Sequence, residues 1–516
     1  MTLPANLLLE NQRRAGVLLH ISSLPSAYYT GDLGVEAYRF VDFLHEIGAT
    51  VWQTLPINMT HADNSPYQCL SAHAGNPDFI SLEALHAQGL LSKQDLSGLI
   101  TEKTQLLTKA YLAFAEQSDT QEFTDFMNFC DKQVDWLHDF ALFLALRTKF
   151  NQAGWNTWPE TYKKRDIPTL RHAREELAQE IAVIKFTQFI FFKQWMALKK
   201  YANDKNIKMF GDIPIFVAYD SADVWAQPYL FKLDAEQNMT VVAGVPPDYF
   251  SATGQRWGNP HYNWEAMAKK KFSWWVARMT TQSELFDIVR IDHFRGLEAA
   301  WEIPVSEETA INGQWVLAPG DALLAAIKKA LPNLDLVAED LGIITAEVDA
   351  LRKKYHLPGM KILQFAFSGE ADNPYLPHNI EPDSVVYTGT HDNDTTVGWH
   401  STMDESQLAH LHAHLREHHD QDLWQDEAPN ILHALIEMAM QSKANLAIIP
   451  MQDILALDTT HRMNTPGTAS GNWHWRFNWQ QLEPEQKYLF KNLVESTGRR
   501  LIMSAGRCLA ESTGRN

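Results

Sequence analysis

The apolar residues of this chain gather in eight short runs, each of which ends in polar, glycine or proline residues. Patterns with helical spacing lie between the runs, for example "GVEAYRFVDFLHEIGA" at 34–49 and "PGDALLAAIKKALPN" at 319–333. Strands that alternate with helices are typical of a parallel sheet, and near-continuous apolar runs are typical of strands buried on both faces. The eight predicted strands occupy residues 16–23, 50–56, 209–217, 287–294, 335–342, 360–367, 385–392 and 446–455.

Eight strand–helix units predict an α/β fold of the (β/α)8 TIM barrel type. An open, doubly wound sheet is the alternative, but no GxGxxG motif follows the first run. The second run ends at residue 56 and the third begins at residue 209, which is too long a gap for a single crossover. We therefore expect a large, mostly helical insertion between strands 2 and 3. The expected division is a barrel with its active-site loops over 1–83 and 186–516, and an inserted helical subdomain over 84–185.

The composition narrows the classes of protein and of partner. A net charge of -19 argues against binding to nucleic acid, whose phosphates attract basic proteins. The three cysteines, Cys69, Cys130 and Cys508, lie far apart without CxxC spacing, so we expect neither a disulfide framework nor a zinc site. The start of the chain lacks the pattern of a signal peptide, and no apolar stretch of 18 residues stands out. We expect a cytoplasmic protein with no membrane partner.

Charged residues follow the fourth predicted strand directly, in "FDIVRIDHFRG" at 286–296. Alternate strand residues point to opposite faces, so Arg290 and Asp292 share one face while Val289 and Ile291 share the other. A structural ion pair at a strand end would explain this pattern as well as an active site would. The polar residues at the ends of the other strands decide between these two interpretations.

Three acids meet if the barrel prediction holds, because barrel enzymes carry their active sites at the C-terminal ends of the strands. Asp292 follows the fourth strand, Glu339 the fifth, and Asp392 the seventh. Two carboxyl groups facing one bond suit glycoside chemistry, in which one attacks or stabilises the anomeric carbon and the other protonates the leaving oxygen. We expect Arg290 to lower the pKa of Asp292, and the negative neighbours to raise the pKa of Glu339. A divalent metal site is the rival use of clustered acids.

Seven long segments of this chain form a recognisable series. They are "RRAGVLLHISSLPSAYYTGDLG", "SPYQCLSAHAGNPDFISLE", "GVPPDYFSATGQRWGNPHYNW", "IVRIDHFRG", "VAEDLG", "YTGTHDNDTTVGW" and "RMNTPGTASGNWHWR". In this order they resemble those of the 4-alpha-glucanotransferases of glycoside hydrolase family 77, also called amylomaltases or disproportionating enzymes. The resemblance implies that Asp292 is the nucleophile, that Glu339 is the general acid and base, and that Asp392 fixes the sugar hydroxyls and stabilises the transition state.

The same resemblance implies a set of substrate-binding residues around the three acids. It places Arg290 and His391 at the reacting glucose, and Tyr67 facing the sugar. It also implies that the glycine-flanked loop 254–260 covers the cleft.

Some of these residues could instead have a structural role. Trp257 could be buried in a neighbouring groove, and the polar residues around Ser65 and Tyr67 could simply form a turn. Ser65 and Asn464 join the set because they follow the second and eighth strands, although Asn464 could instead shape a turn before Pro466. The full expected set is Ser65, Tyr67, Asp248, Gln255, Trp257, Arg290, His391 and Asn464.

One motif resembles a metal site without completing it. His410, His414 and His418 stand four apart on one predicted helix face, a spacing that can chelate a transition metal. No carboxylate or cysteine set accompanies them, so we expect a solvated helix face.

The sequence therefore predicts a retaining 4-alpha-glucanotransferase that needs no cofactor and no metal. Its expected partners are maltooligosaccharides and other α-1,4-glucans. An α-glucan hydrolase with the same acids is the nearest alternative, and a barrel that only binds sugars is a more distant one. The sequence carries no signal for chain-length preference or for the oligomeric state.

Overall fold

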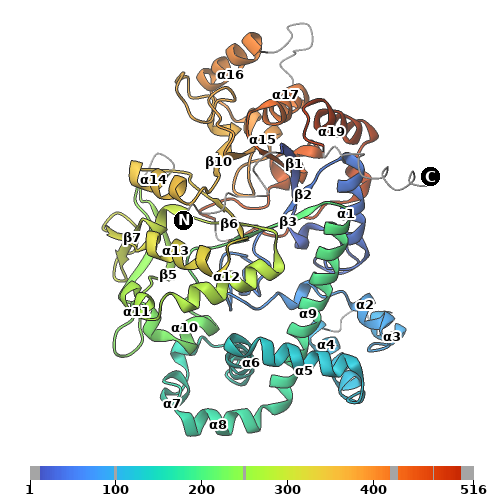
Figure 1. Cartoon of the computed structure of the whole chain (residues 1–516), viewed down its shortest axis with the longest axis vertical. Helices are drawn as coiled ribbons and strands as arrows, with labels where there is room; N and C mark the ends of the chain where they lie inside the picture. The colour runs from blue at the N-terminus through green and yellow to red at the C-terminus, as the bar shows by residue number, and fades with distance from the viewer. Residues whose placement is uncertain (1–11, 98–101, 248–250, 419–427, 469, 501–516) are drawn as a thin grey trace, which may run out of the picture.

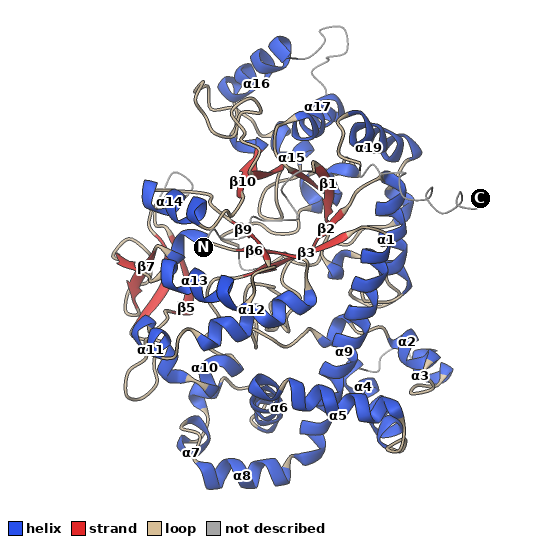
Figure 2. Cartoon of the chain, viewed as in Figure 1, coloured by secondary structure: helices blue, strands red, loops and turns tan. Residues whose placement is uncertain are grey.

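Eight parallel strands form a barrel at the centre of the computed structural model, which describes residues 12–97, 102–247, 251–418, 428–468 and 470–500 (Figures 1 and 2). The order around the sheet is β10-β11-β12-β1-β2-β3-β6-β9. The barrel closes between β9 and β10, where the backbone N–H of Ala338 donates to the carbonyl of Pro358 at 2.9 Å. The prediction of a (β/α)8 barrel is confirmed. The strands are β1 (Arg14–Leu18), β2 (Val51–Gln53), β3 (Lys208–Ile213), β6 (Ile288–Ile291), β9 (Asp335–Ala338), β10 (Gly359–Ile362), β11 (Ser384–Tyr387) and β12 (Leu446–Pro450).

Alternation along the strands separates an inner core from an outer one. Ile288 and Val337 join the cluster of apolar side chains inside the barrel. Val289 and Ala338, their neighbours in sequence, join the larger cluster between strands and helices. Side chains at even positions of β6 therefore point inward, and so do those at odd positions of β9, as the alternation predicts.

Helices surround the strands on the outside (Figure 2). Most have an apolar face turned to the barrel, as α1 does with Phe40, Val41 and Leu44 fully buried. The helices outside the insertion are α1 (Val35–Ile47), α10 (Ala222–Ala226), α11 (Trp264–Lys269), α12 (Ser273–Leu285), α13 (Gly320–Ala330), α14 (Ala346–Lys354), α15 (Thr396–Ser401), α16 (Glu405–His418), α17 (Ala428–Gln441), α18 (Met451–Ile454) and α19 (Pro484–Ser496).

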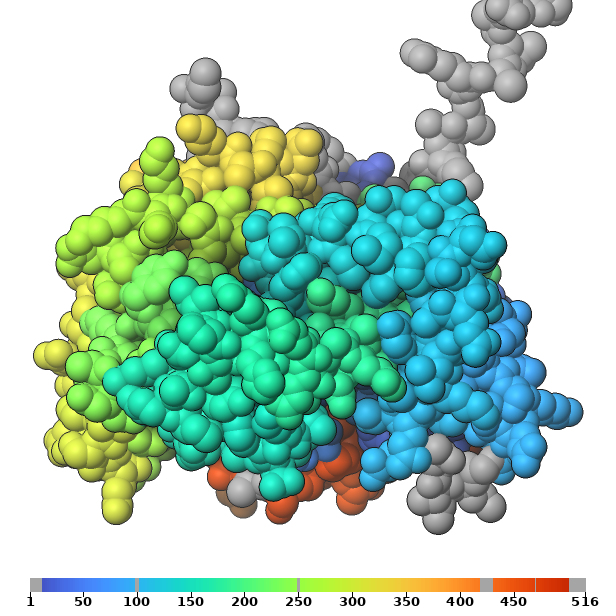
Figure 3. Space-filling view, turned by 90° about the horizontal axis from the view of Figure 1, so that it is seen from below, coloured from blue at the N-terminus to red at the C-terminus, as the bar shows by residue number. Residues whose placement is uncertain are grey.

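The gap between β2 and β3 holds the expected helical insertion, which forms most of the face seen in Figure 3. It packs on the segment after β3: Trp155 Nε1 donates to the carbonyl of Tyr219 at 2.7 Å, and Trp225 Nε1 donates to that of Tyr162 at 3.0 Å. The insertion is therefore attached beside the C-terminal end of the barrel. Its helices are α2 (Leu82–Ala87), α3 (Lys93–Ser97), α4 (Lys103–Ala115), α5 (Gln121–Lys132), α6 (Val134–Lys149), α7 (Glu160–Lys163), α8 (Ile167–Glu176) and α9 (Ala178–Asp204).

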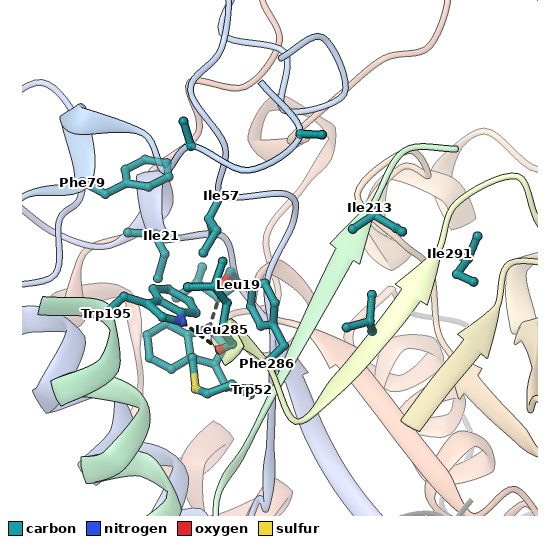
Figure 4. Close-up of a cluster of buried hydrophobic side chains, with 14 of the residues drawn as sticks. Leu19, Ile21, Trp52, Ile57, Phe79, Trp195, Ile213, Leu285, Phe286 and Ile291 are labelled. Carbon is teal, nitrogen blue, oxygen red and sulfur yellow. Dashed lines mark hydrogen bonds between the residues drawn. The ribbon is translucent and has the colours of Figure 1, made fainter. Parts of the chain in front are cut away.

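The last of these helices, α9, belongs to both parts of the molecule. Its first half packs Phe186 and Phe189 against Phe114 and Phe126 of the insertion. Its second half packs on the barrel, where Trp195 Nε1 donates to the carbonyl of Leu285 at 2.8 Å (Figure 4). The boundary expected between residues 185 and 186 thus falls inside one continuous helix, and the division into two units stays a prediction.

Length and composition alone would allow α9 to cross a membrane, since one 18-residue window has a mean hydropathy of 1.2. That window is 61% buried inside the protein, and Trp195 lies edge-on to Phe286 at 5.2 Å between ring centroids. Such burial is typical of the core helix of a soluble protein.

A small antiparallel sheet with the order β5-β4-β7-β8 stands beside the barrel. Its strands are β4 (Val241–Val245), β5 (Gln255–Pro260), β7 (Ala299–Pro304) and β8 (Gln314–Leu317). Residues 255–260, which the sequence suggested as a loop, are therefore the edge strand β5. The glycines around Trp257 had obscured its β pairing with β4.

Candidate active site

The predicted acids stand at the C-terminal ends of the strands that the sequence assigned to them. Asp292 directly follows β6, Glu339 directly follows β9, and Asp392 lies in the loop between β11 and α15. Asp340, the next residue after Glu339, points to the outer layer, where it accepts from the backbone N–H of Met360 at 2.7 Å and pairs with Arg352 of α14. Strand alternation thus separates Glu339 from its acidic neighbour.

Arg290 lies at the centre of the site and holds two carboxylates at once. Its Nη1 donates to both oxygens of Asp212, at 2.8 and 2.7 Å, and its Nη2 pairs with Oδ1 of Asp292 at 2.8 Å. Asp212 comes from β3 and is fully buried, whereas the Asp292 side chain is 29% exposed. The guanidinium is therefore fixed by the fully buried Asp212 on one side while it orients the more exposed Asp292 on the other.

The net pKa of Asp292 differs from the expectation. Burial raises the pKa of Asp292 to about 6, because the lowering by Arg290 is outweighed by desolvation together with the charges of Asp212 and Asp392. The expected lowering by Arg290 is present, but the expected net direction was wrong, since the depth of the site does not show in the sequence. Asp292 remains mostly ionised near pH 7.

Glu339 has the more strongly shifted carboxyl group. Burial raises the pKa of Glu339 to about 8, Arg290 opposes this, and the charge of Asp292 adds to it. Its oxygens accept two backbone N–H bonds, from His293 at 2.7 Å and from Leu341 at 3.0 Å. Near pH 7 one acid is thus mostly ionised and the other mostly protonated, which is the asymmetry that acid–base work at one bond requires.

Asp392 has an environment opposite to that of Glu339. Burial tends to raise its pKa, but His391 and Asn464 outweigh this and hold the pKa of Asp392 well below its usual range. Asn464 Nδ2 donates to Oδ1 of Asp392 at 2.6 Å, and His391 Nε2 lies 3.3 Å from the other oxygen. This carboxylate is held ionised and in a fixed orientation by Asn464 and His391, and the expected binding of the sugar by Asn464 stays a prediction.

Aromatic rings connect Asp392 to the arginine centre. The hydroxyl of Tyr67 donates to Oδ2 of Asp212 at 2.7 Å, and its ring stacks on that of His391 with centroids 5.3 Å apart. Trp473 lies beside both rings, at 5.9 and 6.0 Å. Contacts therefore run without a break from Asp292 through Arg290, Asp212, Tyr67 and His391 to Asp392.

The remaining expected binding residues lie at different distances from this network. Trp257 meets the ring of His293 edge-on at 4.8 Å, and its Nε1 donates to Oε1 of Gln255 at 3.1 Å, which places β5 beside the acids. Ser65 is partly buried two residues before Tyr67, and its role stays a prediction. Asp248 lies outside the residues that the structure describes.

Three residues of the site were missed in the sequence. Asp212 could have been found from the sequence, because it is a lone acid inside an apolar run. It lies two residues after Phe210, which points into the barrel, so both side chains are on the inner face of the strand. His293 has a left-handed backbone (φ 52°) that no pattern announces. Trp473 lies in the last of the seven segments, "RMNTPGTASGNWHWR", but the sequence assigned it no role.

The histidine face of α16 is built differently from a chelating site. His414 packs against Phe367 and His378, with ring centroids 5.8 and 5.9 Å apart, while His410 is exposed. Within the described ranges no group of three or more His, Cys, Asp or Glu residues is arranged to hold a metal ion. The side chain of His418 is outside the described part of the chain.

Known proteins are similar to this chain in sequence and in fold. The sequence model of the family described as 4-alpha-glucanotransferase matches residues 19–482. The 4-alpha-glucanotransferase of Thermus thermophilus is 46% identical over 502 residues, which cover 95% of this chain and 100% of the relative. The chain belongs to the 4-alpha-glucanotransferase family. The chloroplastic/amyloplastic 4-alpha-glucanotransferase of Solanum tuberosum is 41% identical, over 95% of this chain and 87% of its own.

The solved structures agree with this assignment. An amylomaltase from Streptococcus agalactiae in complex with acarbose matches with a TM-score of 0.90 and 35% identity, covering 95% of this chain and 100% of that one. The amylomaltase of Corynebacterium glutamicum, at 19% identity and a TM-score of 0.76, shares the fold. As a member of the 4-alpha-glucanotransferase family the chain is an enzyme of α-glucan transfer, and its relatives do not favour the hydrolase alternative.

Proposed function

We propose that this enzyme moves segments of an α-1,4-glucan to the 4-hydroxyl of an acceptor sugar by a double displacement in which Asp292 is the nucleophile and Glu339 the acid and base. The observation that carries the proposal is the split between the two carboxyl groups, one mostly ionised and one mostly protonated near pH 7, on neighbouring strands. Retaining glycosidases need this pairing.

In the first displacement, Oδ of Asp292 forms a bond to the anomeric carbon while the glycosidic bond breaks. The proton of Glu339 passes to the leaving oxygen, and the shortened glucan departs with a new 4-hydroxyl. Arg290, fixed by Asp212, keeps Asp292 ionised and in place. The product of this half-reaction is a covalent glycosyl-enzyme and an ionised Glu339.

In the second displacement, an acceptor sugar occupies the place of the departed one. Glu339 takes the proton of its 4-hydroxyl, the oxygen bonds to the anomeric carbon, and the bond to Asp292 breaks. Two inversions restore the α configuration, and the enzyme returns to its starting protonation.

Asp392 acts on the charge that develops at the reacting sugar. Its carboxylate is held ionised by His391 and Asn464, so it can accept hydrogen bonds from the hydroxyls of the distorted ring and stabilise positive charge there. His391 and Tyr67 form one stacked wall beside it, which suits the apolar face of a sugar. No cofactor takes part in these steps, and we place the enzyme in the cytoplasm.

Pure maltotriose tests the transfer itself. Transfer of a maltosyl unit between two molecules yields glucose and maltopentaose and leaves the number of reducing ends constant, whereas hydrolysis raises it. Chromatography of the products together with a reducing-end assay separates the two outcomes. A rise of reducing ends in step with substrate loss, without longer chains, would establish the hydrolase instead.

Two variants test the assigned roles. Asp292→Asn should abolish turnover with every donor. Glu339→Gln should be inactive on maltotriose but should still form a glycosyl-enzyme from α-maltosyl fluoride, because fluoride leaves without a proton. Asp404→Asn, at an exposed acid before α16, serves as the control. A Glu339→Gln enzyme that is folded yet equally inactive on both donors would contradict the acid role.

A further inference from the structure

The loop that carries His391 and Asp392 is held at both of its ends by one buried side chain. The loop begins at Thr388, directly after β11, and ends at Thr396, the first residue of α15. Both threonines are fully buried, and both contact Asp453 of α18. Asp392 lies midway between these two attachment points.

Three hydrogen bonds form this attachment. Thr388 Oγ1 donates to Oδ2 of Asp453 at 2.5 Å, and Thr396 donates its Oγ1 to the same oxygen and its backbone N–H to Oδ1, both at 2.8 Å. Asp453 is only 2% exposed. Of the residues that the structure describes, no lysine or arginine pairs with this carboxylate, so its donors all come from the two ends of the loop.

A buried carboxyl group without a cationic partner is costly in a protein core: burial raises the pKa of Asp453, and the hydrogen bonds from Thr388 and Thr396 oppose this. Such features persist mainly where geometry matters more than stability. The same C-terminal segment also holds the middle of the loop, because Arg462 Nη2 donates to the carbonyl of Asp392 at 2.9 Å and Asn464 binds its carboxylate. The chain after β12 therefore fixes the loop at its start, middle and end.

We propose that Asp453 is a positioning residue for the glucan transfer: by bonding Thr388 and Thr396 it fixes the loop between them, and so the place of the Asp392 carboxylate against the reacting sugar. This inference rests on the proposed role of Asp392. Displacements of about 1 Å in such a constellation can cost about 100-fold in rate.

The test removes the hydroxyl groups and keeps the shape. The double substitution Thr388→Val and Thr396→Val retains the volume of both side chains and leaves only the backbone N–H bond. We expect kcat for glucose release from maltotriose to fall by about 10- to 100-fold, with a smaller change in KM. Replacing both threonines by serine restores the donors and should restore kcat to within about threefold of wild type.

A matched control separates positioning from loss of stability. Thr187 is also buried, and its hydroxyl donates to the carbonyl of Val183 within α9, far along the chain from the loop. Thr187→Val should leave kcat unchanged, and it should lower the Tm less than the double substitution does, because the carbonyl of Val183 keeps its bond within the helix. Measuring kcat well below the Tm of each variant keeps loss of stability out of the comparison. If the double variant does not fold, Thr388→Val alone keeps two of the three bonds and provides the same comparison.

The outcomes distinguish this inference from the proposed function. The inference fails if Asp392→Asn is inactive while the valine variants retain wild-type kcat. It also fails if the serine variant is as impaired as the valine variant, because the restored hydroxyl groups would then make no difference. If Asp392→Asn retains full activity, the proposed role of Asp392 fails first. In the Asp392→Asn background the valine substitutions should add little to the loss, because residues that act as one unit are not additive.

Discussion

The backbone N–H of His293, the residue after Asp292, donates a 2.7 Å hydrogen bond to Oε2 of Glu339. The chain thus links the two proposed catalytic acids directly. The bond requires His293 to adopt a left-handed backbone, with φ 52°. A histidine tolerates this conformation better than a β-branched residue does.

This geometry predicts different effects of two substitutions at one position. His293→Asn and His293→Val both lose the ring that meets Trp257, but only valine resists the left-handed backbone. We expect His293→Val to be less stable than His293→Asn by about 1–3 kcal/mol and to have the lower kcat/KM. Loss of the N–H bond should also raise the pKa of Glu339, since that bond lowers it. Urea unfolding and pH–rate profiles measure both effects, and equal behaviour of the two variants would contradict the argument.

The shifted carboxyl groups predict the dependence of activity on pH. The reaction needs Asp292 ionised, so kcat/KM should fall as the pH drops through about 6. It also needs Glu339 protonated, so kcat/KM should fall again as the pH rises through about 8. A bell-shaped profile between these limits is expected for maltotriose. With α-maltosyl fluoride as donor the alkaline fall in the rate of glycosyl-enzyme formation should disappear, and its persistence would assign that limb to another group.

Asp212 should be as necessary as the acids that face the sugar. Asp212→Asn leaves the buried Arg290 with Asp292 as its one remaining carboxylate partner among the described residues, and breaking a buried ion pair costs at most about 3–5 kcal/mol. We expect a large loss of kcat because Arg290 no longer holds Asp292 in place. Tyr67→Phe is the matched control, since it removes only one neutral donor from Asp212, for about 0.5–1.5 kcal/mol. Equal stability of the two variants in urea would contradict the anchoring role.

Trp257 should affect what accepts the sugar more than whether the bond breaks. Its ring stands beside His293, next to both acids, where it can hold an acceptor and exclude water. Trp257→Ala should lower the formation of maltopentaose from maltotriose and increase the share of hydrolysis. The ratio of reducing ends formed to maltotriose consumed measures this change. Trp315→Ala, at a tryptophan of the same small sheet but on the distant strand β8, should leave the ratio unchanged.

The spacing of the two acids should be that of a retaining enzyme. In a crystal structure with a bound glucan, the carboxyl groups of Asp292 and Glu339 should lie about 5–5.5 Å apart. A separation of about 6.5–9.5 Å in the closed enzyme would indicate inversion and would argue against transfer.

The periodicity of apolar residues was sufficient to predict the barrel and the inward direction of Arg290, Asp292 and Glu339. Both depend on strand alternation, which is a local property of the chain. The pKa of Asp292 depends on how deeply the site is enclosed, and therefore could not be predicted from the same residues. The attachment of Thr388 and Thr396 to Asp453 joins residues from two strand ends, so it becomes visible only when β11 and β12 are placed side by side.

Because α9 packs on both the insertion and the barrel, it limits how segments of this protein can be exchanged with those of its relatives. Because one uninterrupted helix supplies Phe186 and Phe189 to the insertion and Trp195 to the barrel, the insertion cannot be exchanged between relatives as a cassette cut at residue 185. A crossover that separates Phe186 and Phe189 from the insertion, or Trp195 from the barrel, breaks one of these two sets of contacts. Homologous recombination within α9 should therefore be tolerated only where the phenylalanine contacts and the tryptophan contact are inherited together with their partners.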